Sequence, residues 1–185
     1  MTTNYKSSFV IPFRIALVMW VLFLIESLSP IDLGFLGVYP RKFTGLIGIF
    51  TSPLVHGNLH HIISNTVPLI FLGTMLFVFY SKIALRVFIQ CYLFTGLLVW
   101  IFGREFYHIG ASGVIYGLAF FHIFFGFFRK DFKSLAISIF VVLLYGGLVY
   151  GVLPSRYGIS WESHMFGALI GIGTAYNLKD IASVD

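Results

Sequence analysis

The sequence predicts an all-α membrane protein with six helical spans, and three observations lead to this fold class. Apolar residues make up 58% of the 185-residue chain and charged residues only 10%, whereas an ordinary soluble domain carries about 25% charged residues. The apolar residues form long runs, and about 20 residues cross the hydrocarbon of a bilayer once. Six such runs leave only short connections, so we expect one membrane domain over residues 1–185 with short polar tails at 1–8 and 177–185.

The spans follow one another with short breaks. Residues 9–28 form an uncleaved first span, because no small-x-small cleavage site follows Glu26. Residues 29–55 are too broken by glycine and proline for a span and too apolar for a solvated loop. We expect them to form an ordered loop in the membrane interface between spans one and two, covered by protein. The other spans are predicted at 59–80, 83–102, 112–128, 135–153 and 161–176.

The basic residues predict the orientation of the chain. If the N-terminus is cytoplasmic, the inner side holds Lys6, Arg14, Lys82, Arg86, Arg129, Lys130, Lys133 and Lys179, and the outer side only Arg41, Lys42, Arg104 and Arg156. Cytoplasmic loops carry the excess of Lys and Arg, so we expect both termini in the cytoplasm, with the reverse orientation as the alternative. The short loops favour a prokaryotic plasma membrane.

The charge and the cysteine content indicate which classes of partner the chain has. The basic residues form no tract or helix face, so the net charge of +5 indicates topology and a lipid bilayer rather than nucleic acid. The single cysteine, Cys91, excludes an intrachain disulfide. The sequence does not predict an oligomeric state.

Polar side chains gather where three of the spans begin. Spans two, four and six run in the same direction in this topology, so their N-terminal ends lie at one face. Ionisable residues within spans usually face a cavity or one another. We therefore expect one site from these polar groups, which are His56, His60, His61, Asn65, Ser112, Glu162, Ser163 and His164.

Ser112 lies between Gly110 and Gly113, where the fourth span starts. Glycine lets the backbone approach a ligand closely, and a helix start leaves N–H groups free to bind an anion. A nucleophile beside such donors is what acyl transfer requires. The alternative is a flexible helix entry whose small residues serve packing alone.

Two glycine pairs suggest how a base reaches this serine. Gly113 and Gly117 lie four apart in the fourth span, as do Gly167 and Gly171 in the sixth. Such pairs let helices pack backbone to backbone, and His164 shares the face of Gly167. Packing of the two helices would bring His164, with a pKa near neutrality, to the serine. The alternative is glycine packing with an unrelated histidine.

Other polar residues fit supporting roles. His61 and Asn65 lie on one helix face and can donate to a developing oxyanion. Tyr116, one turn below the serine, can stack on an imidazole or simply fill the core. A zinc site on His56 and His60 is the competing interpretation, but no carboxylate or thiol completes it, so we expect no metal. Lipid or loop contact is expected for His60, and interface or packing positions are expected for His108 and His122.

These residues resemble the rhomboid family of intramembrane serine proteases. The matching segments are HGNLHHIISN (56–65), GASGVIYG (110–117) and SHMFGALIG (163–171), in the family's order and on its second, fourth and sixth spans. The first loop departs from the family pattern, because Ile47 and Gly48 stand where many members have Trp-Arg. Arg41 is a candidate to replace that arginine from a different register.

The resemblance implies a mechanism and a substrate class. Ser112 would be the nucleophile and His164 the general base, with an oxyanion hole from His61, Asn65 and the Ser112 N–H. Tyr116 would stack on His164, and His56 and Gly110 would support the site. The substrates would be transmembrane or membrane-adjacent segments of other proteins, cleaved without metal or cofactor. Two alternatives remain open: a helix-binding protein without catalysis, and a small transporter, although we find no internal repeat.

Overall fold

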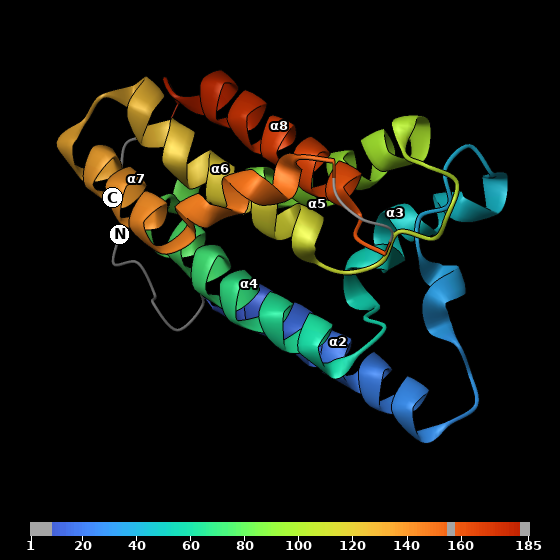
Figure 1. Ribbon diagram of the computed structural model, residues 1–185. Coiled ribbons are helices and arrows are strands. Elements are labelled where there is room, and N and C mark those ends of the chain that lie inside the picture. Colours follow the sequence, from blue (N-terminus) through green and yellow to red (C-terminus); the bar gives the residue numbers. More distant parts are fainter. Residues whose placement is uncertain (1–8, 155–157, 182–185) are drawn as a thin grey trace.

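The computed structural model describes residues 9–154 and 158–181, and its regular elements are helices apart from one isolated bridge between Val38 and His108 (Figure 1). This confirms the all-α class. The predicted N-terminal tail with Lys6, and Arg156 between spans five and six, lie outside the described residues. The long helices are α2 (Val10–Leu28), α4 (Leu59–Phe79), α5 (Ser81–Phe102), α6 (Ser112–Arg129), α7 (Phe132–Tyr145) and α8 (Trp161–Leu178).

Five segments of the described chain are helical, long and apolar enough to cross a membrane. They are α2, α4, α5, α6 and the segment Phe132–Val152, in which α7 continues as the 3-10 helix η4 (Gly146–Val152). The predicted sixth span, α8, is 18 residues long, the same length as α6. It is absent from this set because it is less apolar, and Glu162, Ser163 and His164 in its first turn contribute to this. The count of six spans therefore stays a prediction.

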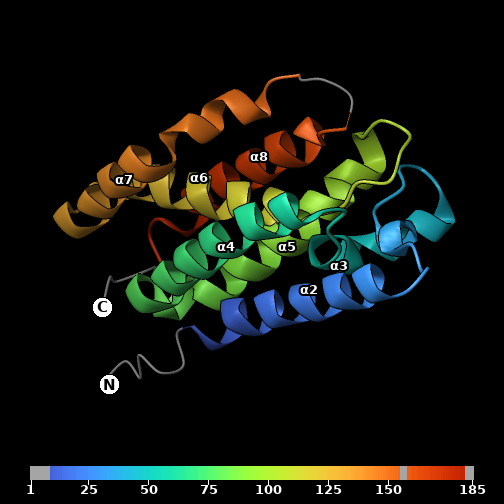
Figure 2. The ribbon, with the colours of Figure 1, turned by 60° about the horizontal axis from the view of Figure 1, so that its bottom comes forward.

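The helix α6 lies at the centre of the bundle. It packs against α4, α5, α7 and α8, and 61% of its apolar window is buried, against 17% for α2. Figure 2 shows α2 outermost, and it packs against α4. The Nε1–H of Trp20 in α2 donates to Thr66 Oγ1 in α4 at 3.1 Å. A central helix that packs against four others is a rigid place to begin a functional site.

The connection between α2 and α4 is ordered, as expected. It contains η1 (Leu33–Leu36), η2 (Phe43–Leu46), α3 (Gly48–Thr51) and η3 (Ser52–Leu54). Arg41 Nη1 donates to the Gly103 carbonyl at 2.8 Å, and the Trp100 indole donates to the Lys42 carbonyl at 2.9 Å. These bonds hold the connection against the end of α5, so Arg41 does anchor this loop. Its location in the membrane interface stays a prediction.

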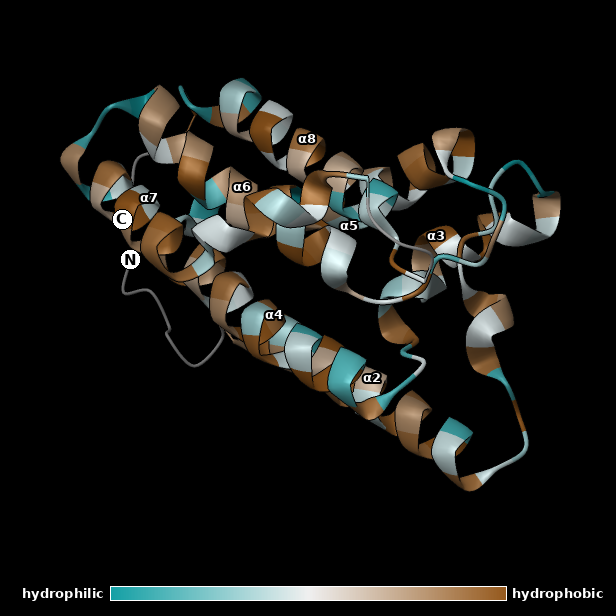
Figure 3. Cartoon of the chain, in the orientation of Figure 1, coloured by the Kyte–Doolittle hydropathy of each residue, from teal (hydrophilic) through white to brown (hydrophobic). Residues whose placement is uncertain are grey.

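The helices α4, α6 and α8 run in the same direction. Their C-terminal ends lie together, because Tyr80 contacts Phe125 with ring centroids 4.9 Å apart and Arg129 donates to the Lys179 carbonyl. Figure 3 shows hydrophilic residues mainly at the two ends of the bundle and hydrophobic residues between them. The N-terminal ends of the same three helices therefore meet at the opposite end.

Candidate active site

A cavity of about 580 Å³ opens where α4, α6 and α8 begin. Its walls come from the first turns of these helices, from the connection before α6, and from η4. The polar side chains that line it include His60, His61, Ser64, Asn65, Tyr107, His108, Ser112, Tyr116, Ser160 and His164. One cavity thus collects predicted site residues from three separate helices.

Ser112 and His164 are in direct contact in this cavity. Ser112 Oγ lies 2.9 Å from His164 Nε2, and His164 Nδ1 lies 3.0 Å from the Gly151 carbonyl oxygen. A carbonyl oxygen only accepts hydrogen bonds, so Nδ1 carries the proton and Nε2 presents its lone pair to the serine hydroxyl. In this arrangement the imidazole can accept the proton of Ser112.

Close packing of α6 on α8 sets this contact. A Cβ atom added at Gly167 would collide with the Gly113 carbonyl oxygen, and one at Gly171 with the Gly117 carbonyl oxygen. Only glycine leaves room for such an approach of the two backbones. The Tyr116 ring stacks on the His164 ring with centroids 4.2 Å apart and planes 2° apart, which fixes the plane of the imidazole.

The turn before Ser112 is held by hydrogen bonds from two of its backbone N–H groups. Gly110 adopts φ +104°, a left-handed conformation that favours glycine, and its N–H donates to the Ser52 carbonyl at 2.8 Å. The Ala111 N–H donates to His56 Nε2 at 3.3 Å. Burial, reinforced by the neighbouring His61, lowers the pKa of His56 to about 3. His56 is therefore neutral near pH 7, as an acceptor must be.

The start of α6 lacks the side-chain cap that α4, α7 and α8 have. Asn58, Asp131 and Ser160 cap α4, α7 and α8, whereas no side chain caps α6. Among the described residues, no hydrogen bond from the Ser112 N–H to a loop carbonyl or to a capping side chain is found. A free N–H beside the Ser112 hydroxyl is a ready donor for an anion in the cavity.

His61 and Asn65 border the same cavity from α4. Asn65 is buried, and its Nδ2 donates to the His61 carbonyl at 2.7 Å, which fixes the amide and leaves its second N–H available. The His61 ring meets the His56 ring edge-on at 4.9 Å, and Nε2 of His61 approaches Gly110 so closely that a Cβ there would lie 2.5 Å away. Both side chains are thus held next to the turn that presents Ser112.

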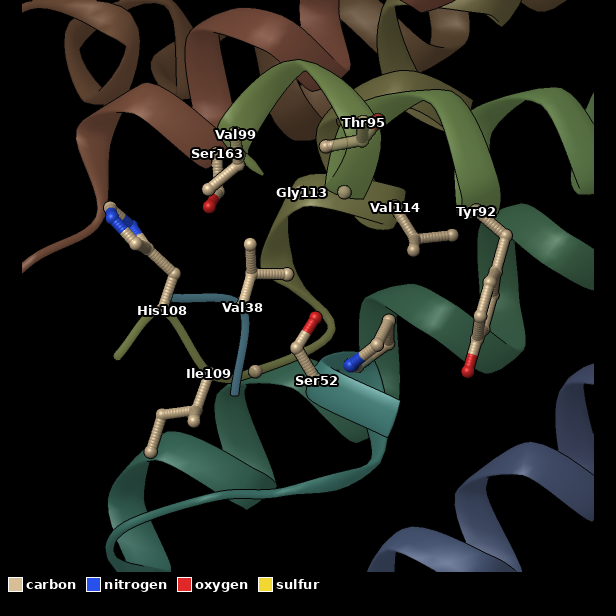
Figure 4. Close-up of a pocket in the computed structure, with 13 residues that line it drawn as sticks. Val38, Ser52, Tyr92, Thr95, Val99, His108, Ile109, Gly113, Val114 and Ser163 are labelled. Atoms are coloured by element: carbon tan, nitrogen blue, oxygen red, sulfur yellow. The ribbon is translucent and has the colours of Figure 1, made fainter. Parts of the chain in front are cut away.

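A second, smaller cavity adjoins this turn on the side of α5 (Figure 4). It has a volume of about 20 Å³, and Ser52, Thr95, Gly113 and Ser163 are among its lining residues. This volume suits about one water molecule. Thr95 Oγ1 is buried there, and the described residues provide it with no hydrogen-bond partner.

Sequence reasoning missed a polar network between the α5–α6 connection and α8. The Arg104 guanidinium binds the Glu162 carboxylate through two hydrogen bonds. His108 Nε2 lies 2.9 Å from the Arg104 carbonyl, so Nδ1 accepts from the Ser160 hydroxyl at 2.5 Å. Burial lowers the pKa of His108. This network clamps the connection that leads into Ser112 onto the start of α8.

The remaining histidines lie in different surroundings. His60, expected toward lipid or loop, lines the cavity instead, together with His61 in the first turn of α4. His122 is fully buried in α6, and its Nδ1 donates to the Leu118 carbonyl at 2.7 Å. In residues 9–154 and 158–181, no three His, Cys, Asp or Glu side chains lie close enough to bind one metal ion.

Comparison with known proteins assigns the chain to a family. Residues 44–180 match the Rhomboid domain. The chain is 34% identical over 169 residues to the uncharacterized proteins Mb1372 of Mycobacterium bovis and Rv1337 of Mycobacterium tuberculosis, covering 84% of this chain and 69% of each relative. It is 32% identical to the uncharacterized protein ML1171 of Mycobacterium leprae, covering 84% of this chain and 65% of that protein. The chain is an integral membrane protein and belongs to the rhomboid family of intramembrane serine proteases.

Proposed function

We propose that this chain is an active serine endopeptidase that cleaves transmembrane or membrane-adjacent segments of other membrane proteins through a Ser112–His164 dyad. The observation that carries the proposal is the hydrogen bond from Ser112 Oγ to His164 Nε2, at 2.9 Å, on an imidazole whose Nδ1–H is already bound. Family membership supports the reaction class. Both dyad residues are present, which favours an enzyme over a binding protein on the same fold.

The first chemical step forms the acyl-enzyme. Ser112 Oγ bonds to the scissile carbonyl carbon while its proton moves to His164 Nε2. The negative charge moves to the carbonyl oxygen, where the Ser112 N–H, the His61 ring and the second Asn65 N–H are placed to donate. As the tetrahedral intermediate collapses, the C–N bond breaks and the leaving amine takes the proton from His164.

The second step restores the enzyme. A water molecule attacks the ester carbonyl, His164 takes its proton, and Ser112 Oγ leaves with that proton as the new carboxyl end departs. The cavity of about 580 Å³ supplies the room for water and peptide. No step uses a metal or cofactor, and none is proposed as a partner. The proposal places α8 as a sixth span in a prokaryotic plasma membrane.

The test is labelling of the detergent-purified protein with a fluorophosphonate probe. Wild type is expected to label, and Ser112→Ala and His164→Ala are expected to lose labelling and cleavage of a transmembrane substrate while keeping their thermal unfolding temperature. Ser29→Ala is the matched control, because Ser29 lies outside the cavity and is expected to label as wild type.

Two outcomes would contradict the dyad. Labelling or cleavage retained in either folded dyad variant would exclude that residue as nucleophile or base. Absence of labelling in folded wild type, repeated in lipid, together with capture of uncut substrate, would favour a helix-binding protein without catalysis.

A further inference from the structure

We propose that the main-chain carbonyl of Gly151 fixes the tautomer and orientation of His164, so that Gly151 is a positioning residue for the proposed dyad. In three-residue serine hydrolases a carboxylate accepts from the second ring nitrogen of the histidine and holds the correct tautomer. Here a peptide carbonyl on η4 occupies that place. The inference rests on the proposed function for its meaning in catalysis, but its geometry can be tested without catalysis.

The hydrogen bonds at the two ring nitrogens carry the argument. His164 Nδ1 is 3.0 Å from Gly151 O, and Nε2 is 2.9 Å from Ser112 Oγ. The carbonyl has no hydrogen to give, so the opposite tautomer would set two lone pairs against each other at Nδ1. It would also place an N–H where Ser112 needs an acceptor. One bond therefore selects the form of the ring that can act as base.

The described residues bring no carboxylate to His164 Nδ1. Glu162, two positions earlier in α8, is buried and bound to the Arg104 guanidinium through both carboxylate oxygens. Both oxygens of Glu162 therefore accept from Arg104 in the α5–α6 connection and not from His164. The Gly151 carbonyl is therefore the acceptor that sets the His164 tautomer.

A side chain at position 151 would displace Tyr116. A Cβ there would collide with Tyr116 Oη, would lie 2.9 Å from Tyr116 Cζ, and would lie 3.4 Å from His164 Nδ1. Contacts of Cβ under 3.0 Å force a neighbour to move. The absence of a side chain thus lets the carbonyl reach the imidazole while Tyr116 stacks on the ring.

The acceptor lies on a segment that also forms the cavity wall. Gly151 belongs to η4, in which no residue is fully buried, and Leu148 of the same segment lines the cavity. A peptide entering the cavity contacts the segment that holds His164. Displacement of η4 would remove the acceptor, so the proposed base depends on the position of this segment.

The experiment compares Gly151→Ala with Gly147→Ala in the full-length protein. Both glycines lie in η4, but a Cβ at Gly147 meets no atom within 4 Å. Gly151→Ala is expected to lower the rate of fluorophosphonate labelling about tenfold or more, the cost of one lost hydrogen bond. Gly147→Ala is expected to label at the wild-type rate.

A spectroscopic measurement separates positioning from folding. In protein labelled with 15N-histidine, at a pH where imidazole is neutral, wild-type His164 is expected to carry its proton on Nδ1. The His164→Ala variant assigns the signal. In Gly151→Ala the signal is expected to move toward a mixture of tautomers, whereas Gly147→Ala keeps the wild-type pattern.

The outcomes distinguish this inference from the proposed function. A wild-type His164 protonated on Nε2, or a Gly151→Ala variant with unchanged tautomer and labelling rate, would overturn the role of Gly151 even if the enzyme is active. An Nδ1–H tautomer that is lost in Gly151→Ala supports the role even if the protein never reacts with the probe. That result would contradict the proposed protease activity and would still support the positioning role of Gly151.

Discussion

A hydrogen bond from the Ala111 N–H to the His56 side chain helps to hold the turn that presents Ser112. The Ala111 N–H is buried and has His56 Nε2 as its acceptor, while Gly110 on its other side is held by Ser52. Leaving a buried N–H without an acceptor costs about 1–3 kcal/mol. Ala111 directly precedes the proposed nucleophile. Loss of the His56 acceptor is therefore expected to lower both the stability of the fold and the reactivity of Ser112.

His56→Phe is therefore expected to lower the free energy of unfolding by about 1–3 kcal/mol and to slow labelling of Ser112. His56→Gln, whose amide oxygen can accept from Ala111, is the matched control and is expected to lose less of both. Unfolding in detergent and labelling rates would measure the two effects. Equal losses in the Phe and Gln variants would contradict a stabilising role for the acceptor at this position.

The same contact predicts a dependence on pH. Folding lowers the pKa of His56 from its ordinary value of 6.5 to about 3, so the folded state favours the neutral ring. This contribution to stability is complete above pH 6.5 and is lost as pH falls toward 3. The difference in stability between wild type and His56→Phe should therefore shrink as the pH falls through this range. A constant difference would contradict the neutral acceptor.

At the scale of elements, the contact between α6 and α8 decides whether the proposed dyad forms. The two backbones touch at Gly113 with Gly167 and at Gly117 with Gly171, because a Cβ at either position of α8 would strike a carbonyl oxygen of α6. Neighbouring backbone cannot move as a flexible side chain can. A methyl group at these positions must therefore separate the helices, and with them Ser112 and His164.

Gly167→Ala is expected to destabilise the fold by about 1–3 kcal/mol, as overpacking does, and to abolish labelling. Gly173→Ala on the same helix is the control, because a Cβ there meets no atom within 4 Å. Alanine in an exposed helix is favoured over glycine by about 0.5–1 kcal/mol, so this control should keep or gain stability. A Gly167→Ala variant as stable and reactive as Gly173→Ala would show that the helices need no backbone contact.

At this scale, some helix contacts can be predicted from the sequence and others cannot. The pairs in α6 and α8 could be found from spacing alone, because the repeat of four residues marks one helix face. Gly151 could not be found, because its contribution is a main-chain carbonyl that any residue type possesses. The Arg104–Glu162 pair was also missed, because it depends on how an irregular connection folds back onto α8.

At the scale of the whole molecule, the polar residues of the candidate site and the basic residues lie at opposite ends of the bundle. The site lies where α4, α6 and α8 begin, and the basic residues Arg129, Lys130 and Lys133 lie at the other end, where α6 ends and α7 begins. The sequence predicted the family and the all-α class because composition and three motifs are properties of long segments. The sixth span, also predicted from the sequence, stays a prediction, because α8 is not among the helices apolar enough to cross a membrane.

This division predicts the orientation in the membrane. Basic loops stay in the cytoplasm, so the connection after α5 should face outward and the connection after α6 inward. Glu105 is 67% exposed in the first connection, and Lys133 is exposed beside the second. Cysteine at Glu105 should react with a membrane-impermeant maleimide in intact spheroplasts, whereas cysteine at Lys133 should react only after permeabilisation. The buried Cys91 leaves wild type as the unlabelled control. The reverse pattern would place both termini outside, and the proposed cavity would then open to the cytoplasm.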